Sequence, residues 1–189
     1  METRVVTLPN LLTLLRILLI PIFLWAILHA HFAYALMIFF IAGITDGLDG
    51  FIARRFNQKS RLGQWLDPAA DKLLLTSTYI VLSLPGYNFQ PIPLWLTAII
   101  IMRDLAIVLA AFIIQRVTGF SDFKPSQPGK WNTTILISTV LLFLVTHALG
   151  RYTEFMDWFY GLALAMTIFS GLHYIYFIYQ ALTNYSREH

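Results

Sequence analysis

The chain has 189 residues, of which 58% are hydrophobic and only 12% are charged, and its mean hydropathy of +0.67 excludes an ordinary water-soluble domain. It contains no cysteine, which excludes disulfides, iron–sulfur clusters and cysteine zinc sites. The net charge of +3 and the isoelectric point near 9.3 suit a protein that contacts anionic lipid headgroups, and they do not require a nucleic-acid partner.

Apolar runs close to the ~20 residues that cross a bilayer recur along the whole sequence. They predict six membrane spans, centred on Leu18, Ile41, Leu75, Ile101, Leu141 and Ala165. Little polar chain is left for a separate soluble domain. We therefore expect an all-α polytopic membrane protein with six transmembrane helices, forming a single membrane domain over residues 1–189.

Basic residues are concentrated in two of the predicted connections. The connection between spans two and three contains Arg54, Arg55, Lys59 and Arg61. The connection between spans four and five contains Arg116, Lys124 and Lys130. Because cytoplasmic loops carry the excess of Lys and Arg, both connections are expected on the cytoplasmic side. An even number of spans then places the N and C termini there too. In a bacterium this predicts a protein of the cytoplasmic membrane.

Four carboxylates interrupt the apolar pattern where the second span ends and the third begins. Asp46 and Asp49 are spaced i, i+3, and Asp67 and Asp71 are spaced i, i+4, so each pair shares one face of its helix. Two neighbouring helices that form a hairpin can point all four side chains at one place. The predicted cluster lies at the cytoplasmic end of this hairpin.

A cluster of this kind needs positive charge. Each carboxylate near a helix centre costs at least about 2.5 kcal/mol on membrane-insertion scales, and repulsion between the acids adds to that cost. Carboxylate oxygens suit hard ions such as Mg²⁺ or Mn²⁺, and two such ions would stabilise a transferring phosphoryl group. The small residues Gly50 and Ala53 would let a nucleotide approach the helix, and Arg54 would meet its phosphate.

Taken alone, the acids also fit roles outside catalysis. They can form structural ion pairs with Arg54, Arg55 and Lys72 at the end of the hairpin. Intramembrane charges also mark ion-coupled transporters, although the repeated halves and interrupted helices typical of many transporters are not evident. A purely structural membrane scaffold would need no buried charge.

The spacing of these residues resembles the signature of the CDP-alcohol phosphatidyltransferases, D-x2-D-G-x2-A-R-x8-G-x3-D-x3-D. All eight fixed positions of the signature are matched, by Asp46, Asp49, Gly50, Ala53, Arg54, Gly63, Asp67 and Asp71. The signature covers about a seventh of the chain. The predicted layout of spans is also what this resemblance implies.

The resemblance implies an enzyme that binds CDP-diacylglycerol at a pair of divalent ions, Mg²⁺ or Mn²⁺, and releases CMP when an acceptor hydroxyl attacks the lipid-side phosphate. The four aspartates would hold the metal ions, and Asp71 would also act as the general base. Gly50, Arg54 and Ser60 would contact the CDP group. Members of the family often form homodimers, which makes a homodimer possible here.

The acceptor alcohol is indicated by shorter resemblances. The segment from Pro9 to Arg16 resembles the N-terminal helix of the glycerophospholipid branch, and Arg103-Asp104 resembles the fourth span of cardiolipin synthases of eukaryotic type. The segment from Lys124 to Thr133 points the same way. We therefore favour phosphatidylglycerol as the acceptor, with glycerol 3-phosphate as the alternative.

Two basic residues are candidates for binding that acceptor, Arg103 and Lys130. Arg103 lies too deep in its span to snorkel easily, so it should either face a polar cavity and hold an acceptor phosphate or pair with an aspartate of the site. Lys130 would steer the headgroup. Glycerol 3-phosphate would need a dense basic pocket, whereas phosphatidylglycerol needs a lateral opening for its acyl chains.

Overall fold

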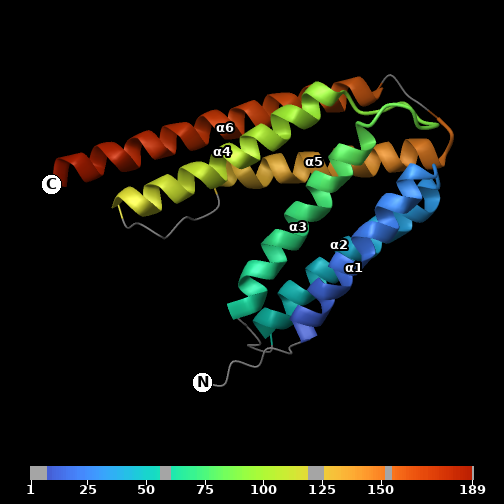
Figure 1. The fold of residues 1–189 in the computed structure, drawn as a ribbon, viewed down its shortest axis with the longest axis horizontal. Helices are drawn as coiled ribbons and strands as arrows, with labels where there is room; N and C mark the ends of the chain where they lie inside the picture. The colour runs from blue at the N-terminus through green and yellow to red at the C-terminus, as the bar shows by residue number, and fades with distance from the viewer. Residues whose placement is uncertain (1–7, 56–60, 119–125, 152–154, 189) are drawn as a thin grey trace. The chain divides into compact units, whose positions relative to one another are not determined.

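The computed structural model describes residues 8–55, 61–118, 126–151 and 155–188, and all regular structure in these ranges is helical (Figure 1). The six helices are α1 (Leu8–Leu28), α2 (Phe32–Arg55), α3 (Arg61–Leu82), α4 (Leu94–Thr118), α5 (Gln127–Ala148) and α6 (Phe155–Glu188). Each predicted span centre falls inside one of these helices. The expectation of an all-α protein is confirmed.

Four stretches in the described helices are long and apolar enough to cross a membrane, namely Leu8–Leu28, Leu94–Ile113, Gln127–Ala148 and Phe155–Ile178. The apolar part of α2, Phe32–Leu48, is shorter. The helix α3 is more polar because it carries Asp67, Asp71 and Lys72. The four apolar stretches identify the chain as an integral membrane protein. The number of six spans and the side of the membrane on which the termini lie stay predictions.

The helices divide into two compact units. Unit 1 comprises Met1–Ile92 and Leu141–Tyr152, and unit 2 comprises Pro93–Val140 and Thr153–His189. The helix α5 contributes its first part to unit 2 and its last part to unit 1. In unit 1, α1 packs against both α2 and α3 (Figure 1). The expectation of one domain over the whole chain stays a prediction.

In α1 the polar side chains point inward and several leucines point outward. Asn10, Thr13 and Arg16 recur every three residues on one face and are buried. Leu11 and Leu18 are more than half exposed. This distribution is the reverse of that in a water-soluble bundle, because lipid solvates the leucines and the polar groups find partners only inside the protein. The first helix therefore presents its polar face to α2 and α3.

The contact between α1 and α2 is built from small and aromatic side chains. Ala35 and Ala42 are two turns apart on α2 and are both buried, so their small size lets the helices approach closely. Between them, the ring of Phe39 lies 5.7 Å from that of Phe23 on α1. This packing fixes α2 along its length, which in turn fixes the position of Asp46 near its C-terminal end.

In unit 2, α4 packs against α6, and the two helices run in the same direction (Figure 1). Leu96 and Ile100 of α4 are buried, as are Met156 and Ala163 of α6. The helix α5 joins α6 through a buried hydrogen bond of 3.0 Å, which the hydroxyl of Thr167 donates to Oδ1 of Asn132. Such a bond satisfies both groups in a setting without water.

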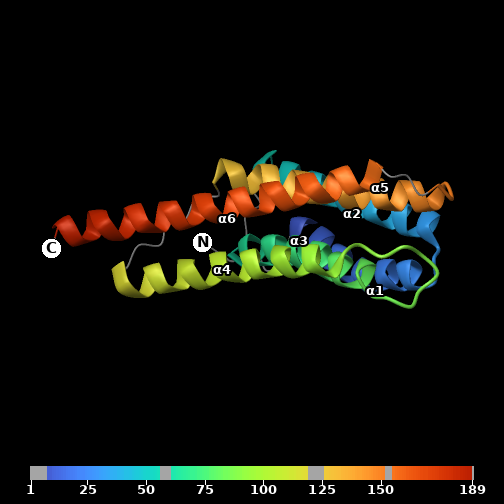
Figure 2. The ribbon, with the colours of Figure 1, turned by 90° about the horizontal axis from the view of Figure 1, so that it is seen from above.

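A short turn joins α1 to α2 (Figure 2). The amide of His31 donates to the carbonyl of Ala26 at 2.8 Å, and Ala30 adopts the left-handed conformation with φ of 57°. The end of α5 has the same arrangement, but there the left-handed residue is Gly150, with φ of 63°. Only glycine adopts this conformation without strain, so Ala30 carries a cost that Gly150 avoids.

We expect Ala30→Gly to stabilise the protein by about 0.5–1 kcal/mol, because relief of the left-handed strain outweighs the added chain entropy of glycine. The measurement is the thermal unfolding midpoint in detergent. The matched control, Gly150→Ala, should lower the midpoint by a similar amount. A lower midpoint for Ala30→Gly would contradict this account of the turn.

Candidate active site

Three of the four predicted acids come together in unit 1, where α2 and α3 face α1. Nη1 of Arg16 donates a hydrogen bond of 2.5 Å to Oδ1 of Asp71, and the same nitrogen lies 2.9 Å from Oδ1 of Asp46. One turn earlier on α1, the hydroxyl of Thr13 donates to Oδ1 of Asp67. Two side chains of α1 therefore hold three carboxylates that belong to α2 and α3.

Helix geometry explains this pairing. Thr13 and Arg16 are three residues apart on α1, and Asp67 and Asp71 are four residues apart on α3, so both pairs span about one helical turn. Thr13 meets the first acid and Arg16 meets the second, in the same order along both helices. The hydroxyl of Thr13 also lies 3.1 Å from the carbonyl oxygen of Pro9, so its single proton is shared between two acceptors.

Burial is uneven across the cluster. The side chain of Arg16 is 1% exposed, whereas those of Asp46 and Asp71 are 48% and 46% exposed. The guanidinium therefore lies behind the acids, and both carboxylates remain open on their opposite side. A buried arginine needs acidic partners, and here Nη1 lies close to two of them.

The remaining predicted donor residues fall outside what the structure describes. Asp49, Gly50 and Arg54 belong to α2, but their side chains are outside the described part, and Ser60 lies outside the described residues altogether. Among the described side chains, no three acids or histidines form a group that could hold one metal ion. The role of these residues as metal or nucleotide ligands therefore stays a prediction.

The donor set nevertheless fits the hard ions predicted from the sequence. The described partners in the cluster are carboxylate oxygens and one hydroxyl, which are ligands that Mg²⁺ and Mn²⁺ accept. The acids already surround a positive charge, that of Arg16. Two half-exposed carboxylates on different helices, Asp46 and Asp71, thus flank one cation, the guanidinium of Arg16.

Thr13 and Arg16 belong to the site although the sequence did not predict them there. In the sequence, the segment from Pro9 to Arg16 indicated only the branch of the family, and through it the acceptor alcohol. The signal that would identify them is their spacing, because a threonine and an arginine three residues apart on one face of an otherwise leucine-rich span must meet polar partners inside the protein.

The two candidate acceptor residues lie in unit 2. Nη1 of Arg103 lies 2.9 Å from Oδ1 of Asp104, the next residue on α4, and Nη2 donates to the hydroxyl of Ser170 on α6. Lys130 is exposed in the first turn of α5. Of the two roles open to Arg103, pairing with an acid is observed, and the acid is Asp104, its neighbour on α4.

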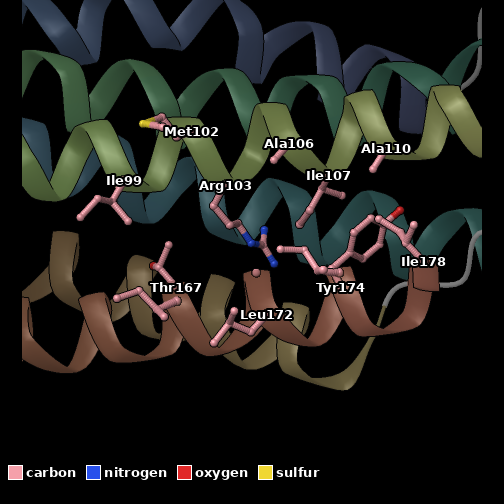
Figure 3. Close-up of a pocket in the computed structure, with 13 residues that line it drawn as sticks. Ile99, Met102, Arg103, Ala106, Ile107, Ala110, Thr167, Leu172, Tyr174 and Ile178 are labelled. Atoms are coloured by element: carbon pink, nitrogen blue, oxygen red, sulfur yellow. The ribbon is translucent and has the colours of Figure 1, made fainter. Parts of the chain in front are cut away.

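Arg103 lines a groove between α4 and α6 (Figure 3). The groove has a volume of about 360 Å³, and its walls are almost wholly apolar, formed by side chains such as Ile99, Ala106, Ala110, Leu172 and Ile178. The guanidinium points from α4 toward α6 within this lining (Figure 3). The groove therefore offers one cation in a long aliphatic surface.

We expect Thr13→Val to destabilise the protein by about 1 kcal/mol, because the isosteric side chain leaves the Asp67 carboxylate without its donor. Thermal unfolding in detergent measures the effect. Thr13→Ser keeps the hydroxyl and is the matched control, with a midpoint expected closer to the unchanged protein. A loss in Thr13→Ser with none in Thr13→Val would show that packing of the methyl group, and not the hydrogen bond, carries the contribution.

Comparison with known proteins identifies the family. The family model described as CDP-alcohol phosphatidyltransferase matches residues 6–169. This range contains the whole acid cluster together with Thr13 and Arg16, and it extends to Arg103, Lys130 and most of the groove. The match therefore covers both units and is not confined to the signature.

Several relatives carry the same name. A cardiolipin synthase (CMP-forming) of Streptomyces coelicolor is 37% identical over 154 residues, which cover 78% of this chain and 69% of the relative. The human cardiolipin synthase (CMP-forming) is 34% identical over 188 residues, 89% of this chain and 61% of the human protein. That of Rattus norvegicus is 48% identical over 110 residues, 58% of this chain and 35% of the rat protein.

The chain thus spans less than two thirds of the human and rat proteins, and slightly more than two thirds of the Streptomyces protein. The resemblance drawn from the signature and the expected enzyme class are both confirmed. The chain belongs to the CDP-alcohol phosphatidyltransferase family and is a phosphatidyltransferase.

Proposed function

We propose that the chain is a cardiolipin-forming phosphatidyltransferase, which joins CDP-diacylglycerol to phosphatidylglycerol and releases CMP. The names of the relatives support the reaction, and the apolar groove beside Arg103 carries the choice of acceptor. Glycerol 3-phosphate is the alternative acceptor. The family assignment leaves no reason to propose an ion-coupled transporter.

We assign binding of the phosphatidyl donor, CDP-diacylglycerol, to the acid cluster. Asp46, Asp49, Asp67 and Asp71 would hold two divalent ions, Mg²⁺ or Mn²⁺. Bound there, the ions would neutralise charge on the phosphates of CDP-diacylglycerol and on the departing CMP. Gly50, Arg54 and Ser60 would contact the CDP group, in keeping with the family signature in and beside which they lie.

Asp71 is the residue that we assign as general base. An oxygen of the acceptor hydroxyl forms a bond to the lipid-side phosphorus, the bond from that phosphorus to CMP breaks, and the hydroxyl proton passes to Asp71. Arg16 binds Oδ1 of Asp71, so Oδ2 is the oxygen that we assign to the proton. The partial exposure of this carboxylate supports access by the acceptor.

We also infer that all six helices cross the membrane and that both termini and the acid cluster face the cytoplasm. The basic residues gathered at the facing ends of α2 and α3, and of α4 and α5, support this orientation. The low hydropathy of α3 follows from the charged residues that the site requires and does not argue against a span. Whether the protein is a homodimer stays a prediction.

The groove supports a lipid acceptor over a small one. Glycerol 3-phosphate is a soluble dianion and would need several cations, whereas the groove lining is aliphatic apart from a few groups such as Arg103, Thr167 and Tyr174. A phosphodiester headgroup carries one negative charge, and it would share the Arg103 guanidinium with Asp104, which already pairs with it. An acyl chain would match the aliphatic walls.

The aliphatic lining extends along α4 on both sides of Arg103. From Ile99 to Ala110 the lining residues extend along α4 for ~16 Å at 1.5 Å per residue. This is about half of the ~30 Å hydrocarbon core, the depth of one lipid leaflet. Arg103 lies within this stretch, ~6 Å from Ile99 and ~10 Å from Ala110. We assign the groove to phosphatidylglycerol, with its phosphate near Arg103, the first part of an acyl chain on the aliphatic lining beside it, and Lys130 steering the headgroup.

The proposed reaction is tested with purified protein in liposomes that contain labelled CDP-diacylglycerol and Mn²⁺. Phosphatidylglycerol should yield cardiolipin and an equal amount of CMP, and glycerol 3-phosphate should yield little product. Asp71→Asn should lower turnover at least ~100-fold while CDP-diacylglycerol still binds. The exposed Asp157 at the start of α6 provides the control Asp157→Asn, which should keep full activity. Phosphatidylglycerol phosphate as the main product would overturn the choice of acceptor.

The groove is tested separately with Ala106→Phe. The added ring should occupy the groove and raise the KM for phosphatidylglycerol about tenfold, a loss of ~1.4 kcal/mol of binding, without changing the KM for CDP-diacylglycerol. Leu105→Phe is the matched control, because Leu105 is 64% exposed and does not line the groove. An unchanged KM in Ala106→Phe would exclude the groove as the acceptor site.

A further inference from the structure

Arg16 stands out because one of its atoms joins three helices. Nη1 of this α1 residue contacts Asp46 of α2 at 2.9 Å and Asp71 of α3 at 2.5 Å. The side chain is 1% exposed, and it is the largest side chain among those fully buried in the described residues. The proposed transfer reaction gives it no role of its own.

The depth of Arg16 makes its charge hard to satisfy in any other way. It is the ninth residue of α1, ~12 Å from the first, in a helix apolar enough to span the membrane. Several residues around it on α1, such as Leu14, Leu15 and Leu18, are exposed to lipid. The guanidinium therefore depends on the acids of α2 and α3, and those acids in turn have its positive charge beside them.

We propose that Arg16 is a positioning residue that acts as the resident cation of the acid cluster. It holds Asp46 and Asp71 side by side on one nitrogen while the site contains no divalent ion. It also competes with entering ions for the same carboxylate oxygens, so the charge of Arg16 weakens metal binding. This inference rests on the proposed metal centre and adds a residue from a third helix to it.

A merely structural ion pair makes a different prediction. If Arg16 only joined the helices, its removal would lower stability equally with and without metal and would leave metal affinity unchanged or weaker. If Arg16 is a resident cation, its removal leaves two adjacent carboxylates in mutual repulsion, which a divalent ion relieves. Removal then costs stability in the metal-free protein and strengthens metal binding.

The test compares Arg16→Gln with Arg16→Lys in detergent. Arg16→Gln removes the charge, and Arg16→Lys keeps it. Binding of Mn²⁺ alone is followed by electron paramagnetic resonance of the free ion, and thermal unfolding is followed in EDTA and in saturating Mn²⁺. These readouts do not require turnover. The exposed Arg151 provides a charge-matched control, Arg151→Gln, outside the cluster.

We expect Arg16→Gln to bind Mn²⁺ roughly tenfold more tightly than the unchanged protein, because a like charge close to the ion has been removed. Its unfolding midpoint should fall in EDTA and recover in Mn²⁺, and Arg16→Lys and Arg151→Gln should keep the original affinity. An unchanged or weaker affinity in folded Arg16→Gln overturns the role of Arg16 alone. Absence of Mn²⁺ binding by the unchanged protein overturns the proposed metal centre and this inference with it.

Discussion

The ion pairs of Arg16 with Asp46 and Asp71 are the interaction on which the rest of unit 1 depends. A charged side chain inside a membrane helix is costly unless it meets opposite charge in the protein, and a broken pair leaves the remaining partner exposed to that cost. The three helices must therefore meet at this point. The packing of α1 against α2 and α3 brings the acids to the same place, so fold and site are set by one contact.

The surrounding lipid explains which faces of the helices are apolar and which are polar. Lipid solvates the outer leucines of α1, so their exposure costs nothing, and the inner face is free to carry Asn10, Thr13 and Arg16. Lipid also solvates the apolar groove of unit 2. Within this groove, Arg103 is held by Asp104 and Ser170. Polar groups thus pair inside each unit, while apolar side chains form much of its exposed surface.

Hydropathy predicted the helices well because each span needs a long apolar run, and every predicted centre lies in a helix. The spacing of the aspartates predicted that they share helix faces, and Asp46, Asp67 and Asp71 do come together. The sequence did not predict Arg16 or Thr13 as their partners, because hydropathy treats polar residues in α1 as interruptions. Likewise Asp104 adjoins Arg103, but Ser170 lies 67 positions further along and only the fold brings it near.

The most direct test of the central claim is the location of manganese in the protein. Crystals grown with Mn²⁺ and CDP-diacylglycerol, measured at the manganese absorption edge, should show two anomalous peaks between the carboxylates of Asp46, Asp49, Asp67 and Asp71, each about 2.1 Å from its oxygen ligands. Arg16 should have released at least one of its two acids. Absence of manganese from these aspartates, with Arg16 still bound to both Asp46 and Asp71, would contradict the account.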